Sequence, residues 1–201
     1  MVYDYSGFPP YTYQVQYPSP GEPALAQQTQ SLLQDAGFAA SLDPAQGYDH
    51  GTFTPLVIMY PEANVPVIQL SMKLGYDPAE HLAAGRAIAR LREDNVLIIG
   101  SGLSYHNMRA MGPPGEQASK TFDQWLQQTL LKSTGVTRSQ KLTDWSSAPA
   151  ARQAHPHEDH LIPLMIAVGA AEGEQAALVY HEEGLFGGIT ASSFRFGSAA
   201  G

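Results

Sequence analysis

One segment constrains this chain most strongly: Ala154 to Gly169, where A-H-P-H-E-D-H is followed by L-I-P-L-M-I-A-V-G. Its imidazole and carboxylate side chains are those that hold divalent metals of intermediate softness, including iron, zinc and manganese. The apolar residues that follow have helical spacing, which predicts a helix with one face in the core. We therefore expect His160 at a buried helix start, with His155 and His157 on the loop before it. A solvated histidine-rich loop is the alternative interpretation.

The composition restricts the class of protein. The 201 residues suffice for one domain with a substantial core, and we expect residues 1–201 to form a single domain. The net charge of -8 speaks against nucleic acid or an anionic membrane surface as the main partner. The absence of cysteine excludes disulfide scaffolds and thiolate chemistry. No apolar run reaches the length of a membrane span and the N-terminus does not resemble a signal peptide, so a cytoplasmic location is expected.

The hydrophobic pattern alternates between segments typical of strands and of helices. Helices are expected over residues 20–37, 78–92 and 116–133 and after His160, and strands over 65–71, 95–100, 176–181 and 189–196. This alternation favours an α/β fold with three layers, α/β/α, around a central sheet that is mostly parallel or mixed. Within the second helix we expect His81 on the surface.

Two further histidines occupy positions suited to function. His50 stands in a turn, G-Y-D-H-G-T, where Asp49 is also placed to cap the next helix. His106 follows the apolar strand expected over 95–100, and ligands in open α/β sheets bind beyond the carboxyl ends of strands. The loops that carry His50, His106 and His160 all lie at element ends, where a sheet edge can bring them together.

The histidines fit several kinds of chemistry. Two could bind a metal while a third acts as acid or base, since an unperturbed imidazole titrates near pH ~6.5. A non-haem iron site with open positions for substrate and dioxygen is one assembly, and a hydrolytic zinc site is the other. A serine nucleophile is less favoured, because no G-x-S-x-G elbow surrounds Ser101 or Ser104.

Five segments taken in order carry a resemblance to a known family. They are Y-D-Y-S-G-F-P-P, D-H-G-T-F-T-P-L, P-V-I-Q-L-S, L-I-I-G-S-G-L-S-Y-H-N-M-R and H-P-H-E-D-H-L-I-P-L. Together they resemble the class III extradiol ring-cleavage dioxygenases, and among these the single-chain branch that contains DOPA 4,5-dioxygenase. The resemblance runs over nearly the whole chain. It implies an enzyme that opens the ring of a catechol-type aromatic diol with O2.

The resemblance also implies roles for individual residues. His50 and His160 would be metal ligands, and His106 would be the acid/base histidine beside the diol. The metal would be Fe2+, or Zn2+ in some members. The remaining matched positions are implied to bind substrate or to support the ligands, namely Tyr48, Asp49, His155 and His157.

One departure from the family pattern affects the metal site. The family carries a further metal-binding histidine in an N-terminal H-G-S-P motif on its first strand, and this sequence has no such motif. With two family ligands the metal affinity is expected to fall unless His157, Glu158, Asp159 or a second chain fills the gap. The missing first strand predicts instability, an altered sheet order or association into a homo-oligomer.

Three hypotheses about function follow from these observations. The first is an extradiol dioxygenase that acts on a small aromatic diol. The second is a catalytically impaired or non-catalytic shortened homologue that binds a metal or an aromatic ligand, or serves as a subunit. The third is a zinc hydrolase. Oxygen uptake with a catechol separates the first from the other two.

Overall fold

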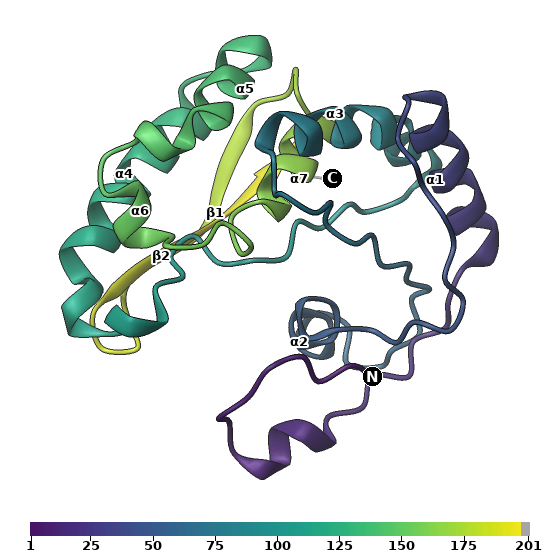
Figure 1. The fold of residues 1–201 in the computed structure, drawn as a ribbon, viewed down its shortest axis with the longest axis horizontal. Helices are drawn as coiled ribbons and strands as arrows, with labels where there is room; N and C mark the ends of the chain where they lie inside the picture. Colours follow the sequence, from purple (N-terminus) through teal and green to yellow (C-terminus); the bar gives the residue numbers. More distant parts are fainter. Residues whose placement is uncertain (198–201) are drawn as a thin grey trace. The chain divides into compact units, whose positions relative to one another are not determined.

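The computed structural model describes residues 1–197, which form two compact units, Met1–Ser71 and Met72 onward (Figure 1). The described residues combine many helices with one small antiparallel sheet, so the chain is a mixed α/β protein. In residues 1–197 no helix has the length and apolar character needed to cross a membrane.

The first unit contains a short 3-10 helix, η1, and two α-helices. Their bounds are η1 Pro10–Gln14, α1 Pro23–Asp35 and α2 His50–Met59. Helix α1 begins with Pro23 at its first position, and the Glu22 side chain accepts a hydrogen bond from the Ala24 amide. Helix α2 is capped as the sequence predicts, because the Asp49 carboxylate accepts a hydrogen bond from the Thr52 amide at 3.0 Å.

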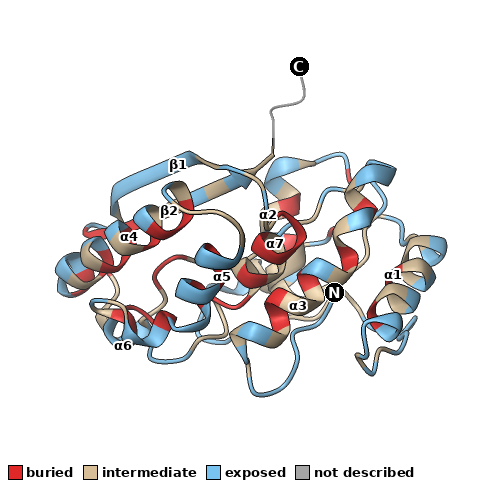
Figure 2. Ribbon diagram, turned by 90° about the horizontal axis from the view of Figure 1, so that it is seen from above, coloured by how far each residue is buried: buried red, intermediate tan, exposed pale blue. Residues whose placement is uncertain are grey.

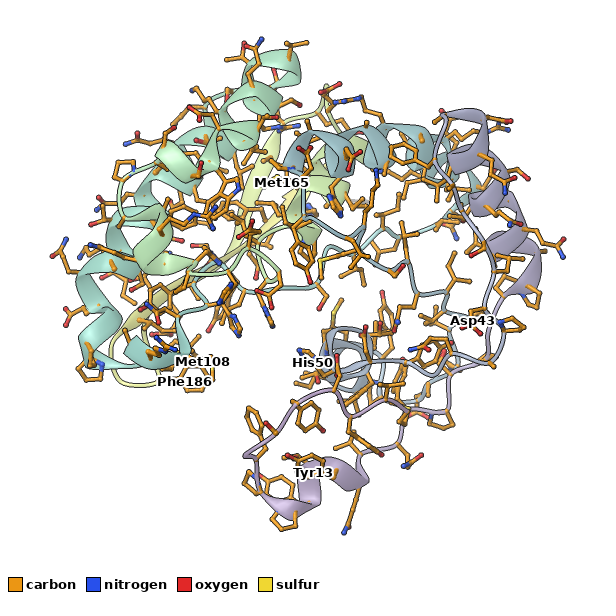
Figure 3. All side chains as sticks on the ribbon, viewed as in Figure 1. Tyr13, Asp43, His50, Met108, Met165 and Phe186 are labelled. Carbon is orange, nitrogen blue, oxygen red and sulfur yellow. The ribbon has the colours of Figure 1, made fainter. Side chains whose placement is uncertain are left out.

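The tyrosine-rich start of the chain packs onto α2 within this unit. The Tyr3 ring meets Phe53 edge-on with the ring centroids 5.9 Å apart, and Phe53 is buried. Tyr5 meets the ring of His50 edge-on at 5.8 Å. This irregular segment therefore surrounds the N-terminal turn of α2 with aromatic rings, and Figure 3 shows His50 there.

The second unit holds the remaining elements. Its α-helices are α3 Pro78–Ile88, α4 Glu116–Leu131, α5 Gly135–Thr143, α6 Ala151–Ala154 and α7 Pro163–Ala170. Its 3-10 helices are η2 Ala89–Asp94, η3 Met108–Ala110, η4 Pro113–Gly115 and η5 Trp145–Ser147. Strands β1 (Ala176–Leu185) and β2 (Ile189–Phe196) pair antiparallel, with Ala176 opposite Phe196 and Leu185 opposite Ile189.

The core of the second unit lies between its helices and the sheet. Figure 2 shows buried residues along α3, α4 and α7. Phe122, Leu126 and Leu130 of α4 are fully or almost fully buried, as their spacing predicts. Met165 and Val168 of α7 are also fully buried, and Figure 3 shows Met165 inside this unit.

Helices α3 and α7 approach each other so closely that only glycine fits at their crossing. A Cβ atom added to Gly169 would lie 2.2 Å from the carbonyl oxygen of Leu82. The absence of side-chain volume at this position lets the two backbones meet. Helix α7 is therefore held firmly in the core, with its first residue, Pro163, close behind the histidine-rich turn.

The expected central sheet is not confirmed. Residues 65–71 and 95–100 form neither helix nor strand in the described part of the chain, whose one sheet is the β1–β2 pair. A strand needs a ladder of hydrogen bonds to a neighbouring strand, whereas these segments make isolated bonds such as that from the Val67 amide to the Pro20 carbonyl. Leu97 and Ile99, which helices would cover in the expected three-layer fold, are 64% and 42% exposed.

The prediction of a surface position for His81 is wrong. Its side chain is buried, donates a hydrogen bond to the Asp77 carbonyl and accepts one from the Lys73 amide.

Candidate functional site

The loop that carries His106 is joined by hydrogen bonds to the histidine-rich turn of the same unit. The Leu103 amide donates to the carbonyl of His160 and the His106 amide to the carbonyl of Ala154, each at 3.0 Å. A Cβ atom at Gly102 would lie 2.2 Å from the His160 carbonyl oxygen, so the close approach depends on this glycine. The two segments that the motifs singled out are therefore bound side by side.

These bonds bring the rings of His106 and His160 into direct contact. The rings stack with their centroids 3.4 Å apart and their planes inclined by 16°. Both residues are half-buried. His160 stands just before Leu161 and Ile162, which are buried, and α7 begins at Pro163. The predicted apolar anchor therefore holds His160 in place, with helix α7 starting three residues later.

Asp159 completes the cluster. Its Oδ2 atom accepts a hydrogen bond from Nδ1 of His160 at 2.8 Å, whereas its Oδ1 atom is buried without a hydrogen-bond partner among residues 1–197. One potential ligand atom from each of His106, Asp159 and His160 lies within 4.8 Å of the others. Two imidazoles and a carboxylate at this separation form a donor set suited to a divalent metal.

The charge of Asp159 is maintained by its neighbours. Burial opposes ionisation of the carboxyl, but the nearby imidazoles of His160 and His106 and the hydrogen bond from His160 together lower its pKa below the usual value. The carboxylate is therefore an anion at neutral pH.

His155 lies behind the cluster in the core. Its side chain is fully buried, with the rings of Phe122 and Trp145 edge-on at centroid distances of 5.2 Å and 6.1 Å. Its Nε2 atom is 3.1 Å from the carbonyl oxygen of Ser104, which can only accept, so Nε2 carries the proton. Burial lowers the pKa of His155 to about 4, so the ring is neutral at pH 7. This buried neutral ring supports the loop of His106 through its hydrogen bond to the Ser104 carbonyl. It does not face solvent.

The other side chains of the turn have different surroundings. His157 is exposed. The Glu158 carboxylate pairs with Arg152 at 2.7 Å, and the guanidinium of Arg152 lies over the ring of Trp145 at 4.6 Å. Neither belongs to the group of ligand atoms that contains His106 and His160.

His50 belongs to the first unit and has its own carboxylate partner. Its Nδ1 atom lies 2.7 Å from Oδ1 of Asp4, and its amide donates to the same oxygen at 3.2 Å. Burial acts to raise the pKa of Asp4, but the hydrogen bonds and charge of His50 outweigh it and lower that pKa. Tyr48 donates its hydroxyl to the carbonyl of Val67 at 2.9 Å, and burial raises the pKa of this phenol. Tyr48 and Asp49 thus hold the segment around His50 in place.

Sequence reasoning did not single out Asp159 among the residues of the turn. Its signal was the carboxylate directly before His160 in the E-D-H triplet, but Glu158 carries the same chemistry one residue earlier. Only the structure separates the two carboxylates, because one contacts Arg152 and the other contacts His160.

The chain is similar to a known family and to several known proteins. Residues 1–197 match the family described as the catalytic LigB subunit of aromatic ring-opening dioxygenase. The chain is 37% identical over 201 residues to a 4,5-DOPA dioxygenase extradiol of Beta vulgaris, covering 98% of this chain and 74% of the relative. It is 36% identical over 197 residues to the dioxygenase tasH of Hapsidospora irregularis, covering 91% of this chain and 60% of that relative.

A solved structure is also similar. The crystal structure of an uncharacterized protein from Escherichia coli K12 matches with a TM-score of 0.77 and 29% sequence identity, over 90% of this chain and 75% of that one. The chain therefore spans about three quarters of that protein and of the Beta vulgaris relative, and 60% of the Hapsidospora irregularis relative.

The sequence similarities confirm the family predicted from the five motifs and, at the level of the family, the predicted class of aromatic ring-opening dioxygenase. The chain belongs to the LigB family of catalytic subunits of aromatic ring-opening dioxygenases.

Proposed function

We propose that this chain carries out the reaction of its family, the opening of a catechol-type aromatic diol by O2 at a divalent metal centre beside His160. The observation that carries the proposal is the contact between His106 and His160, because it joins the two chemistry-bearing motifs of the resemblance in one site. In such a reaction a ring C–C bond next to a hydroxyl-bearing carbon breaks, and both oxygen atoms of O2 enter the product.

The donor set at His160 suits the metals expected for this chemistry. Imidazole and carboxylate donors accommodate Fe2+, Zn2+ and Mn2+, and we propose Fe2+ as the working ion, with Zn2+ as the alternative. When bound, the metal would supply Lewis acidity toward the diol oxygens and, as Fe2+, electrons for the reaction with O2. His50 is proposed from the resemblance as a further ligand, and the hydrogen bond between its Nδ1 and Asp4 orients the ring as carboxylates orient metal-binding histidines.

His106 is proposed as the acid and base of the reaction. A diol whose oxygens are held at His160 would place a hydroxyl next to the stacked ring of His106, within reach for proton transfer. His106 would take the hydroxyl proton as the diol binds and return a proton to the opened product. The hydrogen bond from its amide to Ala154 fixes the position of its backbone.

The remaining predicted residues act on the site from outside. We propose that His155 braces the loop of His106 through Ser104, and that Tyr48 and Asp49 hold the segment of His50. His157, which is exposed, is proposed only as a contact for substrate. The single-domain organisation, the three-layer architecture, homo-oligomer formation and cytoplasmic location stay predictions; the apolar sequence pattern of 65–71 and 95–100 supports the three-layer architecture.

The similar proteins indicate a class of substrate. Several are 4,5-DOPA dioxygenases, so we propose a substituted catechol of the DOPA type as the substrate. Anaerobically Fe2+-loaded protein mixed with a panel of catechols that includes DOPA is expected to consume O2 and form a yellow ring-opened product. The variant His160→Ala should lose both signals, and Glu158→Gln is the matched control from the same turn. Absence of O2 uptake with every catechol would contradict the proposal.

A further inference from the structure

The metal site proposed above has two donors that the resemblance identifies, His50 and His160. The turn before α7 offers three further side chains with donor atoms: His157, Glu158 and Asp159. The structure distinguishes between them.

Two of the three are poorly suited to complete the site. His157 is exposed and lies outside the group of ligand atoms around His160. Glu158 is paired with Arg152, whose position is fixed in turn by the ring of Trp145. Moving Glu158 to a metal would break a charge-assisted hydrogen bond of 2.7 Å.

Asp159 differs from both in the state of its two oxygens. Oδ2 is bonded to His160, but Oδ1 is buried and lacks a hydrogen-bond partner in the described part of the chain. A buried carboxylate oxygen without a partner is costly, since that atom has lost water without a replacement. A cation beside His106 and His160 would compensate for that loss, because one carboxylate oxygen of Asp159 and one ring nitrogen of each histidine lie within 4.8 Å of one another.

We propose that Asp159 is a direct metal donor, which binds a divalent cation of the Fe2+, Mn2+ and Zn2+ class together with His160. This inference rests on the metal site of the proposed function and adds a donor to it. The unpartnered Oδ1 atom is the donor, and the hydrogen bond between Oδ2 and His160 sets the orientation of both side chains.

The test measures metal binding and needs no substrate. Metal-free protein is titrated with Zn2+ by calorimetry, and with Co2+ by absorption. Asp159→Asn is the decisive variant, because the amide oxygen can still accept the hydrogen bond from His160 while the amide nitrogen cannot bind a metal. We expect Zn2+ and Co2+ affinity to fall at least about tenfold, the scale seen when a group that supports a metal site is lost. Glu158→Gln is the matched control, with affinity within about twofold of the parent protein.

A second readout separates a donor from a residue that only supports the fold. Because the Asn amide keeps the hydrogen bond from His160, the melting temperature of the metal-free protein should fall only slightly, while the increase in melting temperature on adding Zn2+ should shrink. Unchanged affinity in Asp159→Asn, or an equal loss in Glu158→Gln, would overturn the inference. If the Asn variant does not fold, Asp159→Glu decides: retention of affinity within about tenfold supports a carboxylate donor, and a greater loss overturns it.

Metal binding by Asp159→Asn and catechol opening by the parent protein can succeed or fail independently. Weakened metal binding in Asp159→Asn together with no catechol opening by the parent protein would uphold the donor and reject the dioxygenase reaction. Catechol opening by the parent protein with unchanged metal affinity in the variant would do the reverse.

Discussion

The two units each contain a histidine whose Nδ1 atom is bonded to an aspartate. His50 pairs with Asp4 at 2.7 Å in the first unit, and His160 pairs with Asp159 at 2.8 Å in the second. The side chains are similarly accessible, at 36% and 39% for the first pair and 25% and 33% for the second. Neither the pair distance nor exposure therefore distinguishes them.

The pairs differ in what surrounds the two members. The His50 ring meets Tyr5 edge-on, and Asp4 Oδ1 also accepts a hydrogen bond from the amide of His50, so that this oxygen is bonded twice to His50. The His160 ring is stacked on a second imidazole, and the carboxylate of Asp159 keeps one buried oxygen without a partner in residues 1–197. A histidine–aspartate pair thus indicates an oriented imidazole, whereas a second imidazole and a spare oxygen indicate a place for a cation.

The sharpest way to break this comparison is to remove the imidazole stacked on His160. The variant His106→Asn should lose about 10²- to 10⁴-fold in turnover of catechol, the usual contribution of a positioned acid or base. Its Zn2+ affinity should fall far less, since His160 and Asp159 are retained. Steady-state O2 uptake and calorimetry on one preparation give both values. A turnover within threefold of the parent protein would remove His106 from the chemistry.

Removal of His160 itself should affect binding before catalysis. His160→Ala deletes both a proposed ligand and the partner of Asp159, so we expect metal affinity to fall by about 100-fold or more, the upper end of the range for supporting groups alone. Titration with Co2+ checks this. Binding as tight as in the parent protein would mean that the metal is held elsewhere in the chain.

The buried His155 predicts a dependence of stability on pH. Its pKa is depressed to about 4 in the folded protein, whereas an unfolded histidine titrates near pH ~6.5. The unfolded chain binds the proton first, so the protein loses stability as the pH falls from about 6.5 toward 4, by about 3 kcal/mol in all. Urea unfolding at pH 7.5 and 4.5 measures the loss. His155→Gln should lose less over the same range, and an equal loss would place the acid-sensitive group elsewhere.

The weakest effect is expected from the pair in the first unit. His50→Ala removes a ligand implied by the resemblance, but the donors of the second unit remain, so metal affinity should fall by about tenfold, less than in His160→Ala. An exposed pair of this kind contributes at most about 1 kcal/mol to folding, so urea unfolding should change little. A loss of affinity as large as that of His160→Ala would show that the two pairs are equal partners in the site.

Local patterns in the sequence predicted the local structure well. The last strand, expected over 189–196, is found as Ile189–Phe196, and the cap of α2 by Asp49 is present. The helix expected over 78–92 is present as α3 followed by the 3-10 turn η2. These features depend on neighbours within a few residues, which the sequence itself displays.

Features that depend on distant segments were harder to predict. The apolar run at 95–100 resembles a buried strand, but a ladder needs a second strand, which residues 1–197 do not bring to it. His81 was expected at the surface because nothing around it in the sequence suggested a site, yet its ring is buried and bonded to the amide of Lys73 and the carbonyl of Asp77. In the site, the motifs identified His106 and His160, but the choice between Glu158 and Asp159 depended on where Arg152 lies.

The central claim is that the chain opens an aromatic diol with O2, and isotopically labelled dioxygen tests it most directly. Fe2+-loaded protein is mixed with DOPA or a simple catechol under labelled O2, and the product is analysed at once by mass spectrometry. We expect a ring-opened product that carries both labelled oxygen atoms, formed by the parent protein and not by His160→Ala. An intact ring, or a product whose added oxygens come only from water, would contradict it.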